Sequence, residues 1–245
     1  MLTGNVALIT GGSRGIGAAC ARKLAALGAD IAVVYAGNAE KANEVCAACE
    51  ALGVRARAYQ CDVADFDAVK QTVAAVKAEL GSVDILVNSA GITRDGLVAA
   101  MCEADFDAVI DTNLKGTFNM IRHCARLFLR AGHGRIVNIS SCDGKTPASG
   151  VAIYGAAKAG VISLTKSFAL ELADYDINSN CVAPGWVESE AVLSGDRWKT
   201  YLPQIPSRRL GKLSEIAESC VFLCNDKVSY INGEILDVNG AIIMD

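Results

Sequence analysis

The chain has 245 residues, of which 52% are hydrophobic and 20% are charged, a size for which we expect one large globular domain. A formal net charge of −4 without any basic run excludes the concentrated positive surface of a nucleic-acid-binding protein. The N-terminus has no charged and apolar leader, and no stretch approaches the roughly 20 apolar residues of a membrane span, so we expect a cytoplasmic protein.

Short apolar runs alternate along the chain with longer segments of helical periodicity, the pattern of strand-helix units around a parallel sheet. Runs such as Ile85-Leu86-Val87 alternate little, as expected for strands covered on both faces. We predict strands near residues 5–10, 30–35, 54–59, 84–88, 134–140, 177–183 and 234–238. We predict helices over residues 15–27, 39–52, 65–80, 103–110, 112–131, 152–174 and 214–224.

A glycine-rich turn follows the first predicted strand and opens the first predicted helix. Its glycines, Gly11, Gly15 and Gly17, allow the backbone to turn tightly and to approach a pyrophosphate at a helix N-terminus. Three residues separate the first two glycines, so the spacing departs from the usual G-x-G-x-x-G. A turn with a purely structural role is the alternative.

The end of the second predicted strand indicates which dinucleotide binds. NAD-binding folds place an acidic residue about 20 residues beyond the glycines, where it holds the ribose 2′-hydroxyl. Here residues 34–38 read Val-Tyr-Ala-Gly-Asn, without an acid. Arg14, within the glycine turn, suits a 2′-phosphate because a guanidinium binds phosphate oxygens in pairs. We therefore expect NADPH, and the missing carboxylate is a stronger argument than Arg14, whose alternative role is a solvated surface charge.

The ten cysteines indicate neither a disulfide framework nor a metal site. Disulfide frameworks belong to short secreted chains. Cys46 and Cys49 have the spacing of half a zinc site, but a structural site needs four ligands and the chain has two histidines. Cys142, directly after Ser141, is either an oxidisable thiol beside an active site or a chance neighbour. We expect six cysteines to be small buried side chains on helices: Cys20, Cys46, Cys49, Cys124, Cys220 and Cys224.

Tyr154 and Lys158 are the pair most indicative of chemistry. Residues four apart lie on one face of a helix, so the ammonium can stand beside the phenol. A unit charge about 4 Å away is worth roughly 4 kcal/mol at an effective dielectric of about 20, enough to bring a phenol pKa towards neutrality. Carbonyl reduction needs such a proton donor and a group that holds the carbonyl oxygen, for which Ser141 is the candidate.

The segment from Pro184 to Pro206 is the one irregular part of the pattern. Gly195 and Pro203 interrupt any long helix there. We interpret residues 186–210 either as a mobile substrate lid or as an ordinary surface excursion.

Taken together, these motifs resemble the short-chain dehydrogenase/reductase family over essentially the whole chain. The matching residues are Thr-Gly-x-x-x-Gly-x-Gly at 10–17, Asp62-Val63, Asn88-Ser89-Ala90-Gly91, Asn113, Ser141, Tyr154-x-x-x-Lys158 and Pro184-Gly185. Asn88-Ser89 departs from the commoner Asn-Asn by a small polar exchange. The resemblance implies a single-domain, Rossmann-like, doubly wound sheet of seven parallel strands and a homotetramer paired through the helices containing Asn113 and Tyr154.

The resemblance also implies a role for each matching residue. Tyr154 would be the general acid, Ser141 would orient the carbonyl, Lys158 would hold the nicotinamide ribose and favour tyrosinate, and Asn113 would anchor a water that links Lys158 to solvent. Asp62 and Val63 would contact adenine, Asn88 and Gly91 the adenosine ribose side, and Val187 and Ser189 the carboxamide. The implied cofactor-binding residues are Gly11, Ser13, Arg14, Ile16, Gly17, Asp62, Val63, Asn88, Gly91, Tyr154, Lys158, Pro184, Gly185, Val187 and Ser189.

Within the family, several stretches resemble bacterial 3-oxoacyl-[acyl-carrier-protein] reductases, among them residues 91–95, 109–116 and 205–211. The resemblance implies NADPH-dependent reduction of a 3-oxoacyl thioester and a meeting with an acidic acyl carrier protein. These reductases often carry Arg or Lys at the positions of Leu170 and Tyr175, so the surface here is more acidic than expected. Arg126, Arg130 and Arg135 are either another docking patch or solvated charge.

Two other functions are open from the sequence. The same chemistry on another ketone or secondary alcohol, such as a steroid or a small xenobiotic, would use the same residues. A non-catalytic dinucleotide-binding sensor is the third hypothesis, and the intact set Ser141, Tyr154 and Lys158 argues against it because a sensor needs no proton donor.

Overall fold

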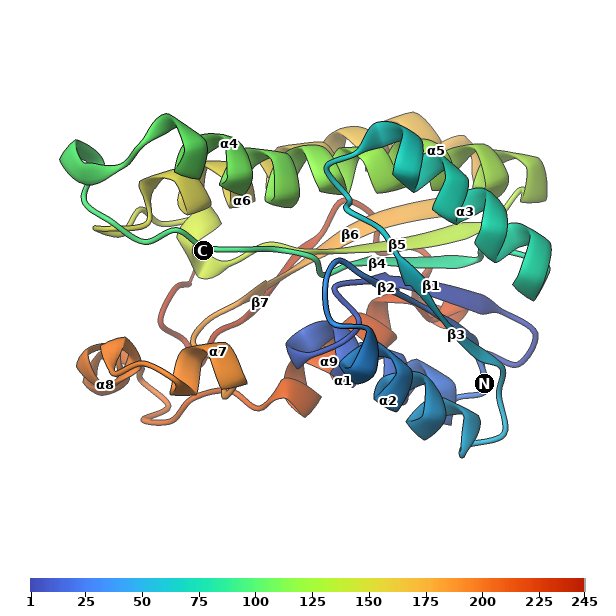
Figure 1. The fold of residues 1–245 in the computed structure, drawn as a ribbon, viewed down its shortest axis with the longest axis horizontal. Coiled ribbons are helices and arrows are strands. Elements are labelled where there is room, and N and C mark those ends of the chain that lie inside the picture. The colour runs from blue at the N-terminus through green and yellow to red at the C-terminus, as the bar shows by residue number, and fades with distance from the viewer. Residues whose placement is uncertain (245) are drawn as a thin grey trace.

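The computed structural model, which describes residues 1–244, contains one sheet of seven parallel strands (Figure 1). In chain order the strands are β1 (Val6–Thr10), β2 (Asp30–Tyr35), β3 (Ala56–Gln60), β4 (Ile85–Asn88), β5 (Gly134–Ile139), β6 (Ile177–Pro184) and β7 (Ile235–Val238). All seven predicted strands are present, so the predicted α/β fold in one domain is confirmed.

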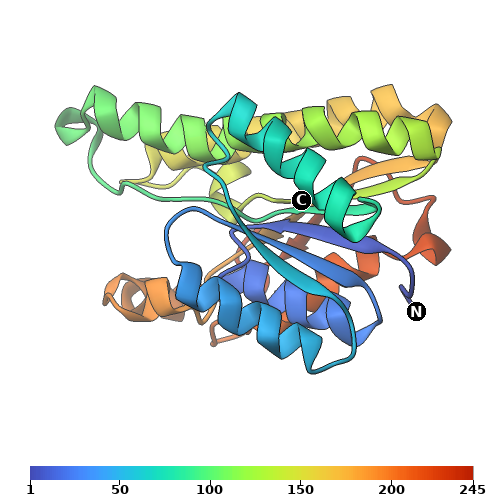
Figure 2. The same cartoon turned by 45° about the vertical axis from the view of Figure 1, so that its right-hand side comes forward.

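Helices cover both faces of this sheet. Figures 1 and 2 show α1 (Gly15–Ala26), α2 (Ala39–Glu50) and α9 (Leu213–Leu223) on one face. On the other face lie α3 (Phe66–Leu80), α4 (Glu103–Ile110), α5 (Gly116–Ala131) and α6 (Ala152–Leu172). Two short helices, α7 (Glu190–Leu193) and α8 (Arg197–Tyr201), stand apart from these layers. No helix within residues 1–244 is long and apolar enough to cross a membrane.

Alternate residues of the strands supply two separate hydrophobic layers. Ala7 and Ile9 of β1 pack with the core under α1, α2 and α9, whereas Val6 and Leu8 pack with the core under α3 and α5. This follows from the period of two in a strand, and it accounts for the continuous apolar runs of β1, β2 and β4. Leu24 of α1 is completely buried, and burial of a side chain of this size contributes about 1.5–3 kcal/mol.

The strand order, β3-β2-β1-β4-β5-β6-β7, creates a crevice at one edge of the sheet. The chain builds outward from β1 through β2 and β3, and then returns to place β4 on the other side of β1. At such a reversal the loops after the two central strands diverge, which leaves room for a ligand at their carboxyl ends. The glycine turn after β1 and the loop after β4 meet there, because Thr10 Oγ1 accepts hydrogen bonds from the backbone N–H groups of Ser89 and Ala90, both at 3.0 Å.

The junction between α4 and α5 differs from the prediction of two separate helices. Residues Asp111–Lys115 form a π-helical turn that joins them into one continuous helix. The wider turn is stabilised by Asn113, whose Nδ2 donates to the carbonyl oxygens of Val109 and Ile92, both at 2.9 Å. Periodicity could not predict this, because the turn depends on a contact with a distant loop. Single π turns within α-helices are often found at functional sites.

Candidate active site

The structure brings Ser141, Tyr154, Lys158 and Asn113 together at the carboxyl edge of the sheet. Ser141 follows β5, Tyr154 and Lys158 lie on the first two turns of α6, and Asn113 occupies the π turn. Lys158 Nζ lies 5.6 Å from the centre of the Tyr154 ring. A Cβ built on Gly91 would lie 2.6 Å from Asn113 Oδ1 and 3.6 Å from Lys158 Nζ, so Gly91 sits between the two.

Close backbone packing fixes the position of Ser141 against α6. A Cβ at Gly144 would lie 2.8 Å from the Lys158 carbonyl carbon, and a Cβ at Gly155 would lie 2.9 Å from the Asp143 carbonyl oxygen. Ser140 Oγ adds a hydrogen bond of 2.9 Å to the Lys158 carbonyl oxygen. Because contacts this short exclude any side chain, the two glycines determine how near the serine comes to Tyr154.

The electrostatics of Tyr154 and Lys158 differ from the sequence-based expectation. Burial lowers the pKa of Lys158 to about 8, and its ammonium donates to the carbonyl oxygen of Ile139 at 2.7 Å. Burial also raises the pKa of Tyr154 above its ordinary value, the Asp143 carboxylate raises it further, and the Ser141 hydroxyl lowers it. The expected decrease towards neutrality is therefore wrong for this structure, because desolvation of the phenolate outweighs the attraction of a lysine committed to Ile139. Tyr154 holds its proton at neutral pH.

The glycine turn forms a compact cradle at the N-terminus of α1. Gly11 and Gly15 have positive φ angles of 62° and 55°, and a Cβ at Gly17 would overlap the Gly11 carbonyl oxygen. No side chain caps α1 and no acid lies in its first turn, so its first N–H groups are free to bind an anion. This arrangement fits the pyrophosphate of a dinucleotide. Ser13 and Arg14 precede the helix, and Ile16 lies in its first turn.

The residues at the end of β2, 34–38, contain no acid at the position expected for a ribose-binding carboxylate. Asn38 there caps α2 by accepting the Lys41 N–H at 2.8 Å, so it does not occupy the place of a ribose-binding carboxylate. Arg14 and Lys41 both line a surface depression of about 540 Å³. Lys41 Nζ also lies 2.7 Å from Glu190 of α7. The sequence analysis missed Lys41, although a lysine three residues after the helix cap was a signal for a second cation near Arg14.

The residues expected around the adenosine half lie along the crevice, with different exposures. Asp62 Oδ1 accepts the Ala64 N–H at 2.9 Å, and Val63 is buried against Gly116. Asn88 is turned into the sheet, where its Nδ2 donates to Asn138 Oδ1 at 2.8 Å. Its own Oδ1 and that of Asn113 are buried without a hydrogen-bond partner. Such atoms are costly to leave unpaired, so they indicate places where a ligand or water is accommodated.

The residues expected near the carboxamide follow β6. Pro184 ends the strand, and Gly185 packs so closely that a Cβ there would lie 2.9 Å from Asn239 Cβ. Val187 pairs with Gly211 in a parallel bridge, and Ser189 Oγ accepts the Val192 N–H at 3.3 Å as the cap of α7. The backbone between Pro184 and Ser189 therefore connects β6 to α7 and pairs with the segment that contains Gly211.

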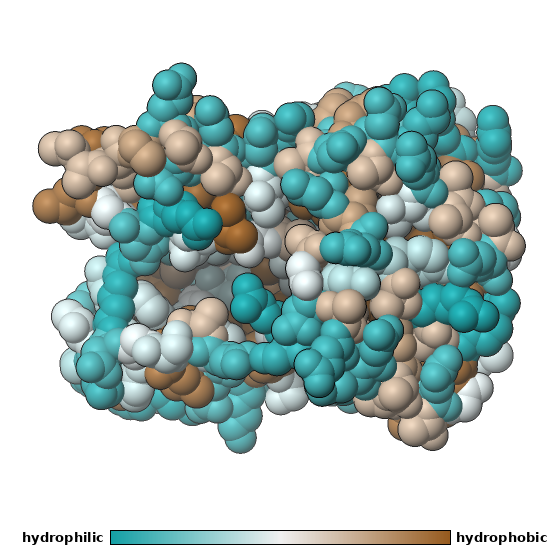
Figure 3. All heavy atoms as spheres, viewed as in Figure 1, coloured by the Kyte–Doolittle hydropathy of each residue, from teal (hydrophilic) through white to brown (hydrophobic). Residues whose placement is uncertain are grey.

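The segment after β6 closes one side of a hollow that Figure 3 shows between α7–α8 and the α4–α6 layer. The Trp186 and Tyr201 rings stack with centres 4.9 Å apart. Arg197 of α8 lies over both rings, pairs with Asp95 and donates to the Ser149 carbonyl oxygen at 3.2 Å. The sequence analysis did not identify Arg197, because its partners are distant in the chain.

The cysteines expected on helices, and Cys142, are all buried. The six helical cysteines are buried, as predicted, and no group of His, Cys, Asp and Glu within residues 1–244 could hold a metal. Cys142 is buried too, and burial raises the pKa of its thiol to about 11, which keeps it in the unreactive form.

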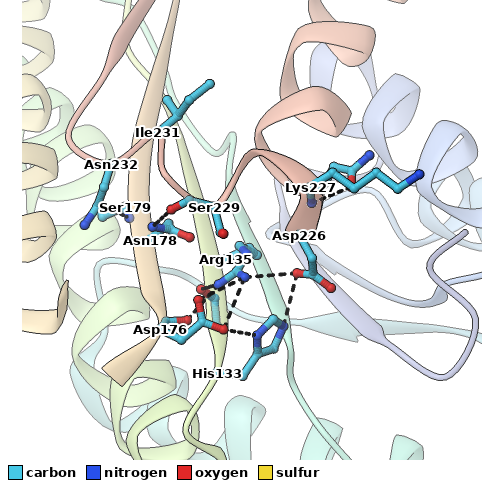
Figure 4. Close-up of polar contacts among 12 residues, drawn as sticks. His133, Arg135, Asp176, Asn178, Ser179, Asp226, Lys227, Ser229, Ile231 and Asn232 are labelled. Carbon is cyan, nitrogen blue, oxygen red and sulfur yellow. Dashed lines mark hydrogen bonds and ion pairs between the residues drawn. The ribbon is translucent and has the colours of Figure 1, made fainter. Parts of the chain in front are cut away.

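Arg135 is no part of an exposed docking patch. Its side chain is 2% exposed and lies at the opposite edge of the sheet, where Nη2 is 3.2 Å from Asp176 Oδ1 and 3.0 Å from Asp226 Oδ1 (Figure 4). His133 contacts the same two carboxylates. Arg126 and Arg130 are exposed on α5. The sequence placed Arg135 at the start of a strand but could not indicate that two carboxylates enclose it.

Comparison with known proteins agrees with this geometry. A family model described as short chain dehydrogenase matches residues 5–199. The 3-oxoacyl-[acyl-carrier-protein] reductase FabG of Staphylococcus aureus strain Mu50 is 48% identical over 240 residues, which cover 97% of this chain and 98% of the relative. The protein of the same name from Staphylococcus epidermidis is 46% identical with the same coverage. That of Escherichia coli strain K12 is 41% identical over 243 residues, or 98% of both chains.

Proposed function

Because the chain belongs to the short-chain dehydrogenase family, we propose that it reduces the 3-oxo group of an acyl thioester on acyl carrier protein to a 3-hydroxyl group, with NADPH as the reductant. The observation that carries this proposal is identity of 41–48% over almost the whole chain to reductases named for that reaction. The arrangement of Ser141, Tyr154 and Lys158 supports it, since it places a protonated phenol beside a hydroxyl at the edge of the crevice.

In the proposed mechanism the residues of this chain bind the carbonyl oxygen and give it a proton. The hydride for the carbonyl carbon would come from NADPH when it is bound. Ser141 holds the carbonyl oxygen, and Tyr154 transfers its phenolic proton to that oxygen as negative charge develops there. Lys158 would hold the nicotinamide ribose and stabilise the tyrosinate left behind. Asn113 anchors a water through which the proton is replaced from solvent.

We propose NADPH rather than NADH because residues 34–38 at the end of β2 contain no acid that could hold a ribose 2′-hydroxyl, whereas two cations, Arg14 and Lys41, lie nearby. Arg14 and Lys41 line the same depression, and Asn38 is committed to capping α2. A 2′-phosphate gains charge-assisted hydrogen bonds from such groups, whereas a 2′-hydroxyl gains less.

We also propose a homotetramer in the cytoplasm and a substrate lid over residues 186–210. On the two helices expected to pair between subunits, the apolar residues Ile121, Phe128 and Val161 are buried within this chain. Phe118 is 39% exposed and its ring lies 6.3 Å from that of Phe168, which supports an interface at this part of α5 and α6. Arg197 would hold the lid through Asp95.

A second candidate, reduction of a ketone that is not attached to a carrier protein, is favoured by one surface. Leu170 and Tyr175, at the end of α6 where these reductases often carry basic residues, are 84% and 50% exposed, and Glu171 and Asp174 lie beside them. An acidic carrier gains no long-range attraction from this face.

A substrate series separates the two candidates. The loss of NADPH absorbance is followed with acetoacetyl-acyl carrier protein, acetoacetyl-coenzyme A and free ketones at equal concentrations. The proposed function predicts the highest kcat/KM for the carrier-linked thioester. Turnover of free ketones alone would contradict it and favour the second candidate, and absence of turnover with every carbonyl compound would favour a non-catalytic sensor.

A further inference from the structure

The 3-10 turn Cys142–Gly144 places a carboxylate beside the Ser141 hydroxyl. Ser141 Oγ donates to Asp143 Oδ2 at 3.3 Å and accepts the Asp143 N–H at 3.1 Å. Asp143 is half-buried, and the close contact of its carbonyl oxygen with Gly155 fixes the turn against α6. The carboxylate is therefore held at the catalytic hydroxyl by backbone packing.

This contact conflicts with the role of Ser141 in carbonyl reduction. A serine hydroxyl has one proton to donate, and an ionised carboxylate can only accept. If Ser141 donates to Asp143, it has no proton left for the substrate carbonyl oxygen. If Asp143 is protonated, its own O–H donates to Ser141 Oγ, and the serine proton is free for the substrate.

Charged and titratable groups face Asp143 from each element packed around it. Its pKa is raised above the ordinary value first by burial and also by Asp95 from the loop after β4. The hydrogen bond from Ser141 and the guanidinium of Arg197 on α8 lower it, but not enough to cancel the increase. Tyr154 faces it from α6 and Cys142 from its own turn. The protonated form is thus populated at a higher pH than in an exposed aspartate.

We propose that Asp143 is a positioning residue that controls which way the Ser141 hydroxyl donates, and that taking up a proton from solvent releases this hydroxyl to the substrate. No covalent bond between heavy atoms changes in this step, since one proton moves from solvent to the carboxylate and the hydrogen bond between the two side chains reverses. The inference rests on the proposed carbonyl reduction but not on the identity of the carrier.

The first test is the pH dependence of reduction in wild type, Asp143→Asn and Ser141→Ala. The asparagine amide donates to Ser141 Oγ at any pH, so it mimics protonated aspartate. With acetoacetyl-coenzyme A and saturating NADPH, wild-type kcat/KM should fall about tenfold as pH rises through the pKa of Asp143, as expected for loss of one hydrogen bond to the reacting oxygen. The kcat/KM of Asp143→Asn should stay at the high value that wild type has at low pH. Ser141→Ala should be slow at all pH values and lack this decrease.

A matched control separates hydrogen bonding from charge. Asp95→Asn removes a neighbouring negative charge without touching Ser141, so it should move the wild-type decrease to lower pH. Because it also breaks the ion pair with Arg197, the pH at which kcat/KM decreases is compared, and not the absolute rate. The proposal is overturned if Asp143→Asn follows the wild-type profile, if Ser141→Ala retains the decrease, or if Asp95→Asn moves the decrease to higher pH.

A second readout needs no turnover. The carboxyl ¹³C resonance of Asp143, assigned by its loss in Asp143→Asn, is titrated in the free protein. Ser141→Ala should raise the Asp143 pKa, because the hydroxyl no longer stabilises the carboxylate. An unchanged pKa would contradict the contact.

The same experiments distinguish failure of this inference from failure of the proposed function. If wild type reduces a free ketone and no thioester, the proposed function fails, and the pH series with that ketone still tests Asp143. If thioesters are reduced and the profiles of wild type and Asp143→Asn coincide, only the inference fails.

Discussion

Replacing the buried Lys158 by methionine tests the cost of its charge. Its pKa of about 8 in the folded protein lies below the ordinary 10.5, so the unfolded chain binds more protons between these values. The contribution of Lys158 to the free energy of unfolding is therefore lowest below about pH 8 and rises with pH above that value. One unit of pKa is worth about 1.36 kcal/mol, which gives a gain of about 2 kcal/mol between pH 7 and pH 9.5.

The measurement is urea unfolding of wild type and Lys158→Met at several pH values from 7 to 9.5 and at one protein concentration. The difference between the two free energies of unfolding isolates Lys158, because the other titrating groups are common to both proteins. Wild type should gain about 2 kcal/mol relative to the variant over this range. A constant difference would refute the reasoning, since it would mean that Lys158 has the same pKa folded and unfolded. The range stops below pH 10 because Tyr154 has a raised pKa in the folded protein. Near pH 10 the tyrosine ionises in the unfolded chain but not in the folded protein, which lowers the free energy of unfolding.

Three further outcomes follow from the site. Tyr154→Phe should nearly abolish turnover while leaving the NADPH Kd, measured by fluorescence titration, largely unchanged; a variant that keeps most of its activity would exclude Tyr154 as the acid. Arg14→Ala should lower kcat/KM for NADPH about tenfold or more and leave kcat/KM for NADH nearly unchanged. A wild type whose kcat/KM with NADH equals or exceeds that with NADPH would contradict the assignment of Arg14. Gly17→Ala should weaken NADPH binding at least tenfold or prevent folding, because the added Cβ overlaps the Gly11 carbonyl oxygen; circular dichroism separates these cases, and unchanged affinity in a folded variant would show that the turn is not a tight cradle.

The strands were predictable because their signal is local. β4 and β5 are short runs rich in apolar residues and buried on both faces, and runs of this length between helical segments are typical of the strands of a parallel sheet. The spacing of Tyr154 and Lys158 was similarly sufficient to place both on one helix face. What the sequence could not provide was the environment of those groups, since it depends on residues that are distant in the chain.

The π turn at Asn113 and the position of Asp143 illustrate this limit. The π turn contains Asn113, whose side chain is hydrogen-bonded to Ile92, 21 residues earlier. Asp143 is close to Ser141 in the sequence, but its effect depends on the packing of its turn against Gly155 and on the charges of more distant residues. Similarly, Arg135 was expected to be either part of a docking patch or solvated charge, whereas two carboxylates from distant segments enclose its side chain. Propensity and spacing contain no information about such neighbours.

The pKa of Tyr154 is raised and that of Lys158 is lowered in the folded protein, whereas their spacing in the sequence predicts a lowered pKa for Tyr154. Burial favours the uncharged form of both groups, so Tyr154 retains its proton and Lys158 is close to losing one near pH 8. A general acid must begin the reaction protonated, and burial ensures this for Tyr154 across the neutral range. The tyrosinate formed after proton transfer is unfavourable in the same surroundings, which drives rapid reprotonation. At neutral pH Tyr154 is therefore in the form that can give a proton to a carbonyl oxygen, and the reverse reaction, which needs the tyrosinate as base, should require a higher pH.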